Sequence, residues 1–587
     1  MRTSRIDEIA ARFAARGGQP GVAFGIVAGG ELVHGGGLGE RFAGGPAPDV
    51  GTVFRIASMT KSFTASAILA LRDAGDLRLD DRAEAYLPEL RGLQLPAADC
   101  PPVTIRQLLT MTAGFPTDDP WGDRQQGLAA EAFAALLAGG EVRCCWAPGT
   151  RFEYSNLGYA ILGRVIAAVT GSGYETATRR MLLRPLAMDS TGFEAGEFHP
   201  ATLAGGYRWD GSGWLEVQPD PSGAFAPMGG IFSCVTDLAR WVAGFAAAFP
   251  ARDGADASPH PLSRATRREM QLPQVAVADG LAAPAVRIGG PASVSYGFGL
   301  FSMEDPAFGT IIQHSGGYPG YGSQMRWHPQ TGLGAVVLAN STYAGAGALA
   351  SELLAALLAD RGAATTRPVS GRLAGSAPAP GGPWPETIAA RQAVDMLLAD
   401  WDDSAAGRLF APNVALDRPL AQRRADVALL RERIGEFRPD PGRPAEFDSP
   451  AHCRWWLTGE HGTACVQIRL APLRKPLVQQ LVLAVPPGPG SALDLAIRLL
   501  STELNDGGRD WPPELDTAVS TAQVLRQLRL AAAWAGRCVP GAWLAGNGAT
   551  TASLELTGPD GKVSLSVEVD GHGQRLQRAD CALLPPG

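Results

Sequence analysis

Ser58 and Lys61 form a Ser-x-x-Lys pair that has the residue types needed for nucleophilic catalysis. A serine hydroxyl is a weak nucleophile and becomes reactive when a neighbouring base takes its proton. A spacing of three residues places both side chains on one face of a helix, so we expect the amine to reach the hydroxyl. A helix N-terminus near Ser58 would also favour negative charge on the serine oxygen.

The scarcity of lysine strengthens this prediction. Lys61 is one of only three lysines among the 51 basic residues of the chain, and the others are arginines. Arginine keeps its proton in proteins, whereas a lysine can lose it when it is buried. A lysine that persists in an arginine-rich chain is therefore a candidate for proton transfer.

A second motif, Tyr154-Ser155-Asn156, could supply further groups to the same reaction. A tyrosine acts as a general acid or base when its surroundings adjust its pKa. Asn156 could donate a hydrogen bond to a substrate carbonyl and hold the lysine in place.

A third motif, His314-Ser315-Gly316-Gly317, ends a predicted strand. Glycines at a strand end let a substrate approach the backbone closely. The N–H groups of Gly317 and Ser58 could then form an oxyanion hole. Each motif also fits a turn or a cap, but all three together are expected by chance in fewer than about one chain in a thousand.

The order and spacing of S-x-x-K, Y-x-N and H-S-G resemble the serine β-lactamase and penicillin-binding-protein superfamily. Within it they resemble the class C-like branch, which includes class C β-lactamases, D-aminopeptidases, D,D-carboxypeptidases and esterases. The resemblance covers residues 5–360 and is carried by FRIASMTKSFTA (54–65), PGTRFEYSNLGYAILGRVI (148–166) and HSGGYPGYGS (314–323).

The resemblance implies a role for each motif residue. Ser58 would attack the carbonyl and form an acyl-enzyme, and Lys61 would deprotonate it directly or through Tyr154. Tyr154 would protonate the leaving group and activate the deacylating water. The remaining residues would bind the substrate or form the oxyanion hole: Asn156, His314, Ser315, Gly316 and Gly317.

His314 departs from the pattern of the superfamily, in which many members have a lysine. A lysine is a permanent cation that attracts a substrate carboxylate, whereas a histidine is mostly neutral at pH 7. We therefore expect weak activity on penicillins, and a preference for esters, amides or peptides without a nearby carboxylate.

These observations predict a serine hydrolase that acts through Ser58 on an ester, an amide or a D-amino-acid-containing peptide. An acyltransferase would use the same residues. A third interpretation is a penicillin-binding sensor or scaffold without turnover, against which the intact Tyr154 argues. An α/β-hydrolase is disfavoured because the chain has no G-x-S-x-G motif.

The surrounding pattern predicts a β-lactamase/transpeptidase-like α+β domain over residues 1–365. It would contain an antiparallel sheet with flanking helices and a helical subdomain. We expect a strand over 22–28, helices over 54–74 and 156–170, and strands over 296–301, 310–314, 323–327 and 334–339.

Residues 366–383 have the Pro- and Gly-rich composition of a linker. We expect two small accessory α+β modules beyond it, over 384–485 and 490–587. The second could be a repeat of the first, because WLTGEHGTACVQIRL (456–470) resembles WLAGNGATTASLELT (543–557).

Composition excludes several classes of function. A net charge of −7 over 587 residues, without a basic run, argues against a nucleic-acid-binding surface. No long apolar segment or signal peptide is evident, so we expect no membrane segment and a cytoplasmic location. We expect a small-molecule or peptide substrate, no metal and no cofactor, and a homo-oligomer is compatible with the sequence.

Overall fold

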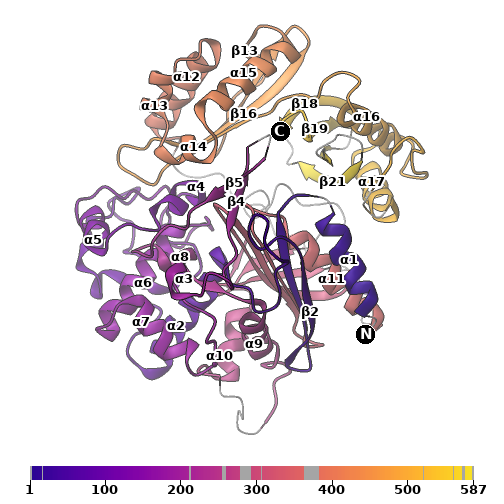
Figure 1. Ribbon diagram of the computed structural model, residues 1–587. Helices are drawn as coiled ribbons and strands as arrows, with labels where there is room; N and C mark the ends of the chain where they lie inside the picture. Colours follow the sequence, from indigo (N-terminus) through magenta and orange to yellow (C-terminus); the bar gives the residue numbers. More distant parts are fainter. Residues whose placement is uncertain are drawn as a thin grey trace. The chain divides into compact units, whose positions relative to one another are not determined.

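The computed structural model describes residues 3–15, 17–210, 213–253, 260–277, 293–305, 307–362, 382–517, 519, 521–559, 561–570 and 575–584 (Figure 1). These residues fall into two compact units. The first contains the described residues up to Val277 and those from 293 to 362, and the second those from 382 onward. Most of the expected linker, residues 366–381, lies outside the described residues.

An eight-stranded antiparallel sheet forms the centre of the first unit, in the order β2-β1-β12-β11-β10-β9-β8-β7. Because β1 pairs with β12, with Val22 opposite Ala339, the two ends of this unit meet inside one sheet. The strands are β1 (Gly21–Ala28), β2 (Glu31–Gly39), β7 (Val275–Ala276), β8 (Ser293–Tyr296), β9 (Phe301–Asp305), β10 (Gly309–Tyr318), β11 (Tyr321–His328) and β12 (Leu333–Ala339).

Helices cover both faces of this sheet (Figure 1). Side chains alternate along β1, so Val22, Phe24 and Ile26 share an apolar cluster with helices α1 and α11. Gly25 points the other way, where a Cβ would lie 2.3 Å from Val235 of α9. The helices of this unit are α1 (Thr3–Ala14), α2 (Thr60–Ala74), α3 (Ile105–Leu109), α4 (Asp119–Gly122), α5 (Ala130–Ala138), α6 (Asn156–Thr170), α7 (Tyr174–Thr178), α8 (Ala226–Gly229), α9 (Val235–Ala246), α10 (Arg264–Gln271) and α11 (Ala346–Asp360).

The expected mixed α/β fold with an antiparallel sheet between helices is confirmed, with a local error in the sheet. The predicted strand over 296–301 is instead a turn that joins β8 to β9. Gly297 N–H donates to the carbonyl of Leu300, and Gly299 takes a φ of 70°, which reverses the chain. Two short strands, β4 (Gly206–Trp209) and β5 (Trp214–Val217), form a separate hairpin.

The second unit is built around a nine-stranded sheet. Its strands are β13 (Phe437–Pro439), β14 (Glu446–Ser449), β15 (His452–Gly459), β16 (Gly462–Leu470), β17 (Val478–Leu483), β18 (Val539–Ala545), β19 (Thr551–Thr557), β20 (Lys562–Val569) and β21 (Leu576–Leu584). Its helices are α12 (Pro385–Ala399), α13 (Asp403–Leu409), α14 (Pro412–Asp417), α15 (Leu420–Ile434), α16 (Ala492–Asn505) and α17 (Thr521–Ala535).

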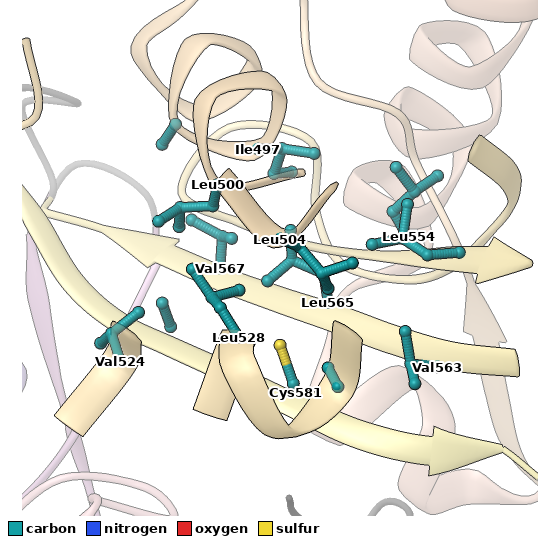
Figure 2. Close-up of a cluster of buried hydrophobic side chains, with 14 of the residues drawn as sticks. Ile497, Leu500, Leu504, Val524, Leu528, Leu554, Val563, Leu565, Val567 and Cys581 are labelled. Atoms are coloured by element: carbon teal, nitrogen blue, oxygen red, sulfur yellow. The ribbon is translucent and has the colours of Figure 1, made fainter. Parts of the chain in front are cut away.

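Helices α16 and α17 pack side by side on strands β19 to β21 through an apolar cluster (Figure 2). Leu500 and Leu504 of α16 and Leu528 of α17 are fully buried there, against Leu565 of β20. Burial of large aliphatic side chains of this kind is the main stabilising contribution to such a core.

The two segments with similar sequences both form β-hairpins, β15–β16 and β18–β19. A parallel pair, Ala464 opposite Trp543, joins the hairpins into one sheet. The division into two modules and their origin by repetition remain predictions. Across the described ranges, no helix combines the length and hydropathy needed to cross a membrane.

Candidate active site

Ser58 lies in a short 3₁₀ turn, η1 (Ala57–Met59), and helix α2 begins only at Thr60. The expectation of a helix from residue 54 is therefore wrong at its start. Residues 54–55 form strand β3 and pair with β6 (Phe232–Ser233), which keeps this backbone extended. Ala57 then takes a left-handed φ of 48°, a conformation that strains a non-glycine residue and often marks a functional site.

The turn that carries Ser58 is fastened to the central sheet. The hydroxyl of Ser323 on β11 donates to the carbonyl oxygen of Ile56 at 2.7 Å. A Cβ on Gly316 of β10 would lie 2.2 Å from the same oxygen, so only glycine permits this approach. The glycine of the third motif therefore sets how closely β10 lies to the turn.

Lys61 is completely buried in the first turn of α2. Its Nζ donates to the Oγ of Ser58 at 2.9 Å, to the Oδ1 of Asn156 at 2.6 Å and to the carbonyl of Met228 at 2.9 Å. Burial lowers the pKa of Lys61 to about 8, although the charges of nearby aspartates oppose this shift. The neutral amine is therefore accessible close to neutral pH, and the charged amine has an acceptor for each of its three protons.

Tyr154 completes the group around the serine. The side chain of Ser58 acts on the pKa of Tyr154 as a hydrogen-bond partner, and the Nζ of Lys61 lies 4.9 Å from the tyrosine ring centroid. Burial, followed by the charge of Asp119, raises the pKa of Tyr154 well above its usual value. The phenol therefore stays protonated at neutral pH, which suits a proton donor.

Asn156 is the first residue of α6 and is completely buried. Its Oδ1 accepts from Lys61, and its Nδ2 donates to Asp119 at 2.9 Å. Asp118 accepts from the backbone N–H groups of Asn156 at 2.6 Å and Leu157 at 2.9 Å, so it satisfies two donors at the start of the helix.

Sequence reasoning did not identify these two aspartates as part of the site. The only local signal is a pair of adjacent carboxylates before Pro120. Nothing in that pair indicates a partner at Asn156, because the partner lies 38 residues further along the chain.

His314 lies on β10 and is 1% exposed. Its ring packs against Tyr154 and Phe301, and its Nδ1 lies 2.6 Å from the carbonyl oxygen of Ser315. A carbonyl can only accept, so Nδ1 carries the proton and Nε2 has a lone pair. Nε2 is buried with no hydrogen-bond partner among the described residues. Burial, followed by the charge of Lys61, lowers the pKa of His314 to about 3, so the ring is neutral at pH 7.

Beyond Gln313, strand β10 has an open edge. Its pairing with β9 ends at Gln313 opposite Phe301, while its pairing with β11 continues to Tyr318 opposite Tyr321. In an antiparallel hairpin closed by two residues, hydrogen-bonded pairs alternate along the strand. The N–H groups of Ser315 and Gly317 therefore point away from β11, toward the open edge.

The structure brings the three motifs together. Hydrogen bonds from Lys61 link Ser58 and Asn156, and both Lys61 and His314 lie against the ring of Tyr154. Ser315, Gly316 and Gly317 follow on the strand that packs next to η1. Within the described part of the chain, no group of three or more histidine, cysteine or acidic side chains could hold a metal ion.

The chain is similar in sequence to several known proteins. A family model described as Beta-lactamase matches residues 6–360. Protein flp of Staphylococcus aureus (strain COL) is 28% identical over 291 residues, which are 49% of this chain and 53% of that protein. Penicillin-binding protein 4* of Bacillus subtilis (strain 168) is 26% identical over 290 residues, which are 47% of this chain and 57% of that protein. The chain thus spans about half the length of the curated relatives it matches.

A solved structure has a similar fold over the whole chain. It is the octameric penicillin-binding protein homologue from Pyrococcus abyssi, with a TM-score of 0.52 and 18% identity. The match covers 99% of this chain and 100% of that one, so the similarity includes the second unit.

Proposed function

The chain belongs to the beta-lactamase family, and on this premise we propose that it is a serine hydrolase that forms an acyl-enzyme at Ser58. The observation that carries the proposal is the contact of a buried, readily deprotonated amine with the serine hydroxyl, 2.9 Å between Lys61 Nζ and Ser58 Oγ. A serine so placed next to a base has the activation that nucleophilic catalysis requires.

In the proposed mechanism neutral Lys61 takes the proton of Ser58 as Oγ attacks the substrate carbonyl. The ammonium that forms keeps acceptors at Asn156 Oδ1 and Met228 O, so the charge is not left unsatisfied in the protein interior. The N–H groups of Ser58 and Gly317 stabilise the oxyanion.

Collapse of the tetrahedral intermediate then releases the alcohol or amine, which receives its proton from Tyr154. Tyr154 recovers a proton from the Lys61 ammonium, so both groups return to their starting state. The high pKa of Tyr154 supports this role, because the phenol is protonated when the leaving group departs. Water replaces the leaving group and repeats the sequence in deacylation.

We propose substrates that lack a carboxylate next to the reacting carbonyl: esters, amides or D-amino-acid-containing peptides. Support comes from His314, which is buried and neutral where a cation would otherwise attract a carboxylate. Short p-nitrophenyl esters should be hydrolysed, and benzylpenicillin slowly or not at all. Penicillin turnover near the diffusional ceiling of about 10⁸ M⁻¹s⁻¹ would contradict this substrate class.

We also propose that residues 1–365 hold the whole catalytic set and that residues 384–587 are accessory. All the motif residues belong to the first unit, which supports this division. A side chain from the second unit found at the reacting carbonyl would refute it.

The decisive experiment is intact-protein mass spectrometry after exposure to a fluorophosphonate probe and to p-nitrophenyl acetate. Wild type should be labelled by the probe and should turn over the ester, and Ser58→Ala should do neither. Stable acylation without turnover would instead indicate a sensor. Faster product release with an added alcohol or amine, yielding a new ester or amide, would indicate an acyltransferase. Hydrolysis retained by Ser58→Ala would refute the proposal.

A further inference from the structure

Tyr343 has a backbone conformation that its residue type does not favour. Its φ is 52°, in the left-handed region that is uncommon for a bulky side chain. The neighbouring residues hold it there: Thr342 Oγ1 accepts from Gly320 N–H at 2.8 Å, and Thr342 N–H donates to the carbonyl of Tyr207 at 2.8 Å. Strain that is maintained by surrounding bonds is typical of functional sites.

The ring of Tyr343 lies against the strand of the oxyanion hole. A Cβ on Gly317 would be 2.5 Å from the ring atom Cδ1, so the ring occupies the space where any other residue would place its side chain. The residue is nevertheless 49% exposed. An exposed ring on Gly317 contributes little to a core, but a substrate at that strand would meet it.

The hydroxyl of Tyr343 donates to Oδ2 of Asp123 at 2.8 Å. Asp123 is 4% exposed, and its backbone carbonyl accepts from the hydroxyl of Tyr318 at 2.8 Å. Tyr318 and Gly317 are consecutive, so their side-chain directions point to opposite sides of β10. Tyr343 therefore joins the Gly317 side of the strand to Asp123, which also accepts from Tyr318 on the other side.

Asp123 also lies within electrostatic reach of the catalytic centre. Its charge raises the pKa of Lys61 and that of Tyr154. The hydrogen bond between Tyr343 and Asp123 thus connects a residue near the proton-transfer groups to strand β10, which carries the N–H of Gly317.

We propose that Tyr343, held by Asp123, is a specificity-determining residue whose ring closes the end of the open edge of β10 and limits the size of the substrate group beside Gly317. This inference rests on the proposed acyl-enzyme chemistry at Ser58. It predicts a selectivity for small groups at this position, which would be lost when the ring is removed.

The test compares size selectivity in wild type, Tyr343→Ala, Tyr343→Leu and Tyr343→Phe. Two ester series are used: p-nitrophenyl acetate against octanoate varies the acyl group, and phenyl acetate against 2-naphthyl acetate varies the leaving group. The readout is the ratio of kcat/KM for the large and small member of each series. A ratio is unaffected by a uniform loss of active enzyme, so a purely structural role of Tyr343 would not change it.

We expect Tyr343→Ala to raise one of the two ratios by about tenfold or more, a change of the size that pocket contacts produce. Tyr343→Leu should raise the same ratio by less. Tyr343→Phe retains the ring but loses the hydrogen bond to Asp123. Its ratio should therefore differ less from the wild-type ratio than the ratio of Tyr343→Ala does. Circular dichroism selects the variants that fold, and Tyr343→Leu carries the test if Tyr343→Ala does not fold.

The outcomes separate the two proposals. If wild type is acylated at Ser58 but both ratios are unchanged in Tyr343→Ala and Tyr343→Leu, only the proposed role of Tyr343 is overturned. If wild type is acylated but releases product slowly, the ratios are calculated from acylation rates in place of kcat/KM. These rates are measured by intact-protein mass spectrometry. No acylation of Ser58 by any ester or by fluorophosphonate would overturn the acyl-enzyme proposal and this inference with it.

Discussion

The Nζ of Lys61 lies 2.9 Å from the Oγ of Ser58, and each group is held in place by further hydrogen bonds around it. Asn156 and Met228 hold the amine, while the sheet holds the turn of Ser58 through Ser323. A lysine in an ordinary surface ion pair would be exposed and fully charged. This one is buried with a lowered pKa, as expected of a group that exchanges a proton.

Lys61→Arg should be nearly as damaging as Lys61→Ala. Arginine cannot give up its proton, and its planar head does not fit among Ser58, Asn156 and the carbonyl of Met228. We expect kcat/KM for ester hydrolysis to fall by at least about 10²-fold, the usual effect of losing a general base. Circular dichroism checks that the variant folds. Activity within about threefold of wild type, well short of such a loss, would show that Lys61 acts only as a charge.

The rate of ester hydrolysis should rise with pH through about 8. Burial lowers the pKa of Lys61 to about 8, and only the amine without its extra proton can accept the proton of Ser58. The charge of Asp119 raises this pKa, so Asp119→Asn should move the ascending limb to lower pH while keeping an oxygen to accept from Asn156.

The matched control for this pH profile is Asp76→Asn, at an exposed position just after α2. We expect its profile to match that of wild type. A kcat/KM that falls as the pH increases through 8 would mean that the protonated amine is the active form, contrary to the proposed mechanism.

Gly316→Ala should nearly abolish hydrolysis. The new Cβ would lie 2.2 Å from the carbonyl oxygen of Ile56 and 2.3 Å from Oγ of Ser323, so β10 and the turn of Ser58 have to separate. A displacement of about 1 Å at a reacting centre can cost on the order of 10²-fold in rate. Gly345→Ala is the control, because its Cβ would meet nothing within 4 Å. Equal activity of the two variants would show that the spacing of β10 and η1 is unimportant.

Asp118→Ala should lower the melting temperature as well as the activity. The substitution removes the buried acceptor of the N–H groups of Asn156 and Leu157. Burying unsatisfied donors costs about 1–3 kcal/mol, and Asn156 would also lose its position against Lys61. Asp118→Asn keeps one acceptor oxygen and should be intermediate. Thermal unfolding, monitored by circular dichroism, gives the melting temperatures of wild type and both variants. An unchanged melting temperature in Asp118→Ala would contradict the role of Asp118 as a buried acceptor.

The class of fold, and the residues that meet around Ser58, could be predicted from the amino-acid sequence. Ser58 with Lys61, Tyr154 with Asn156, and His314 with its glycines are local patterns, because the chemistry needs those residue types at those short spacings. Strands such as β1 and helices such as α6 were also predictable, since their apolar periodicity and end signals are local.

Other features depended on contacts between segments far apart in the chain. Helix α2 begins at Thr60 rather than near residue 54 because β6, which is remote in sequence, pairs with β3. Asp118 meets Asn156 across 38 residues, and Tyr343 meets Asp123 across 220. No local pattern encodes such a meeting.

The same division applies to the electrostatics of the site. That a lysine, a tyrosine and a histidine accompany Ser58 follows from the motifs alone, because residue types are read directly from the chain. Their protonation depends on the folded unit, because burial lowers the pKa of Lys61 and of His314 and raises that of Tyr154. Desolvation depends on every segment packed around a group, and that packing exists only once the whole unit has folded.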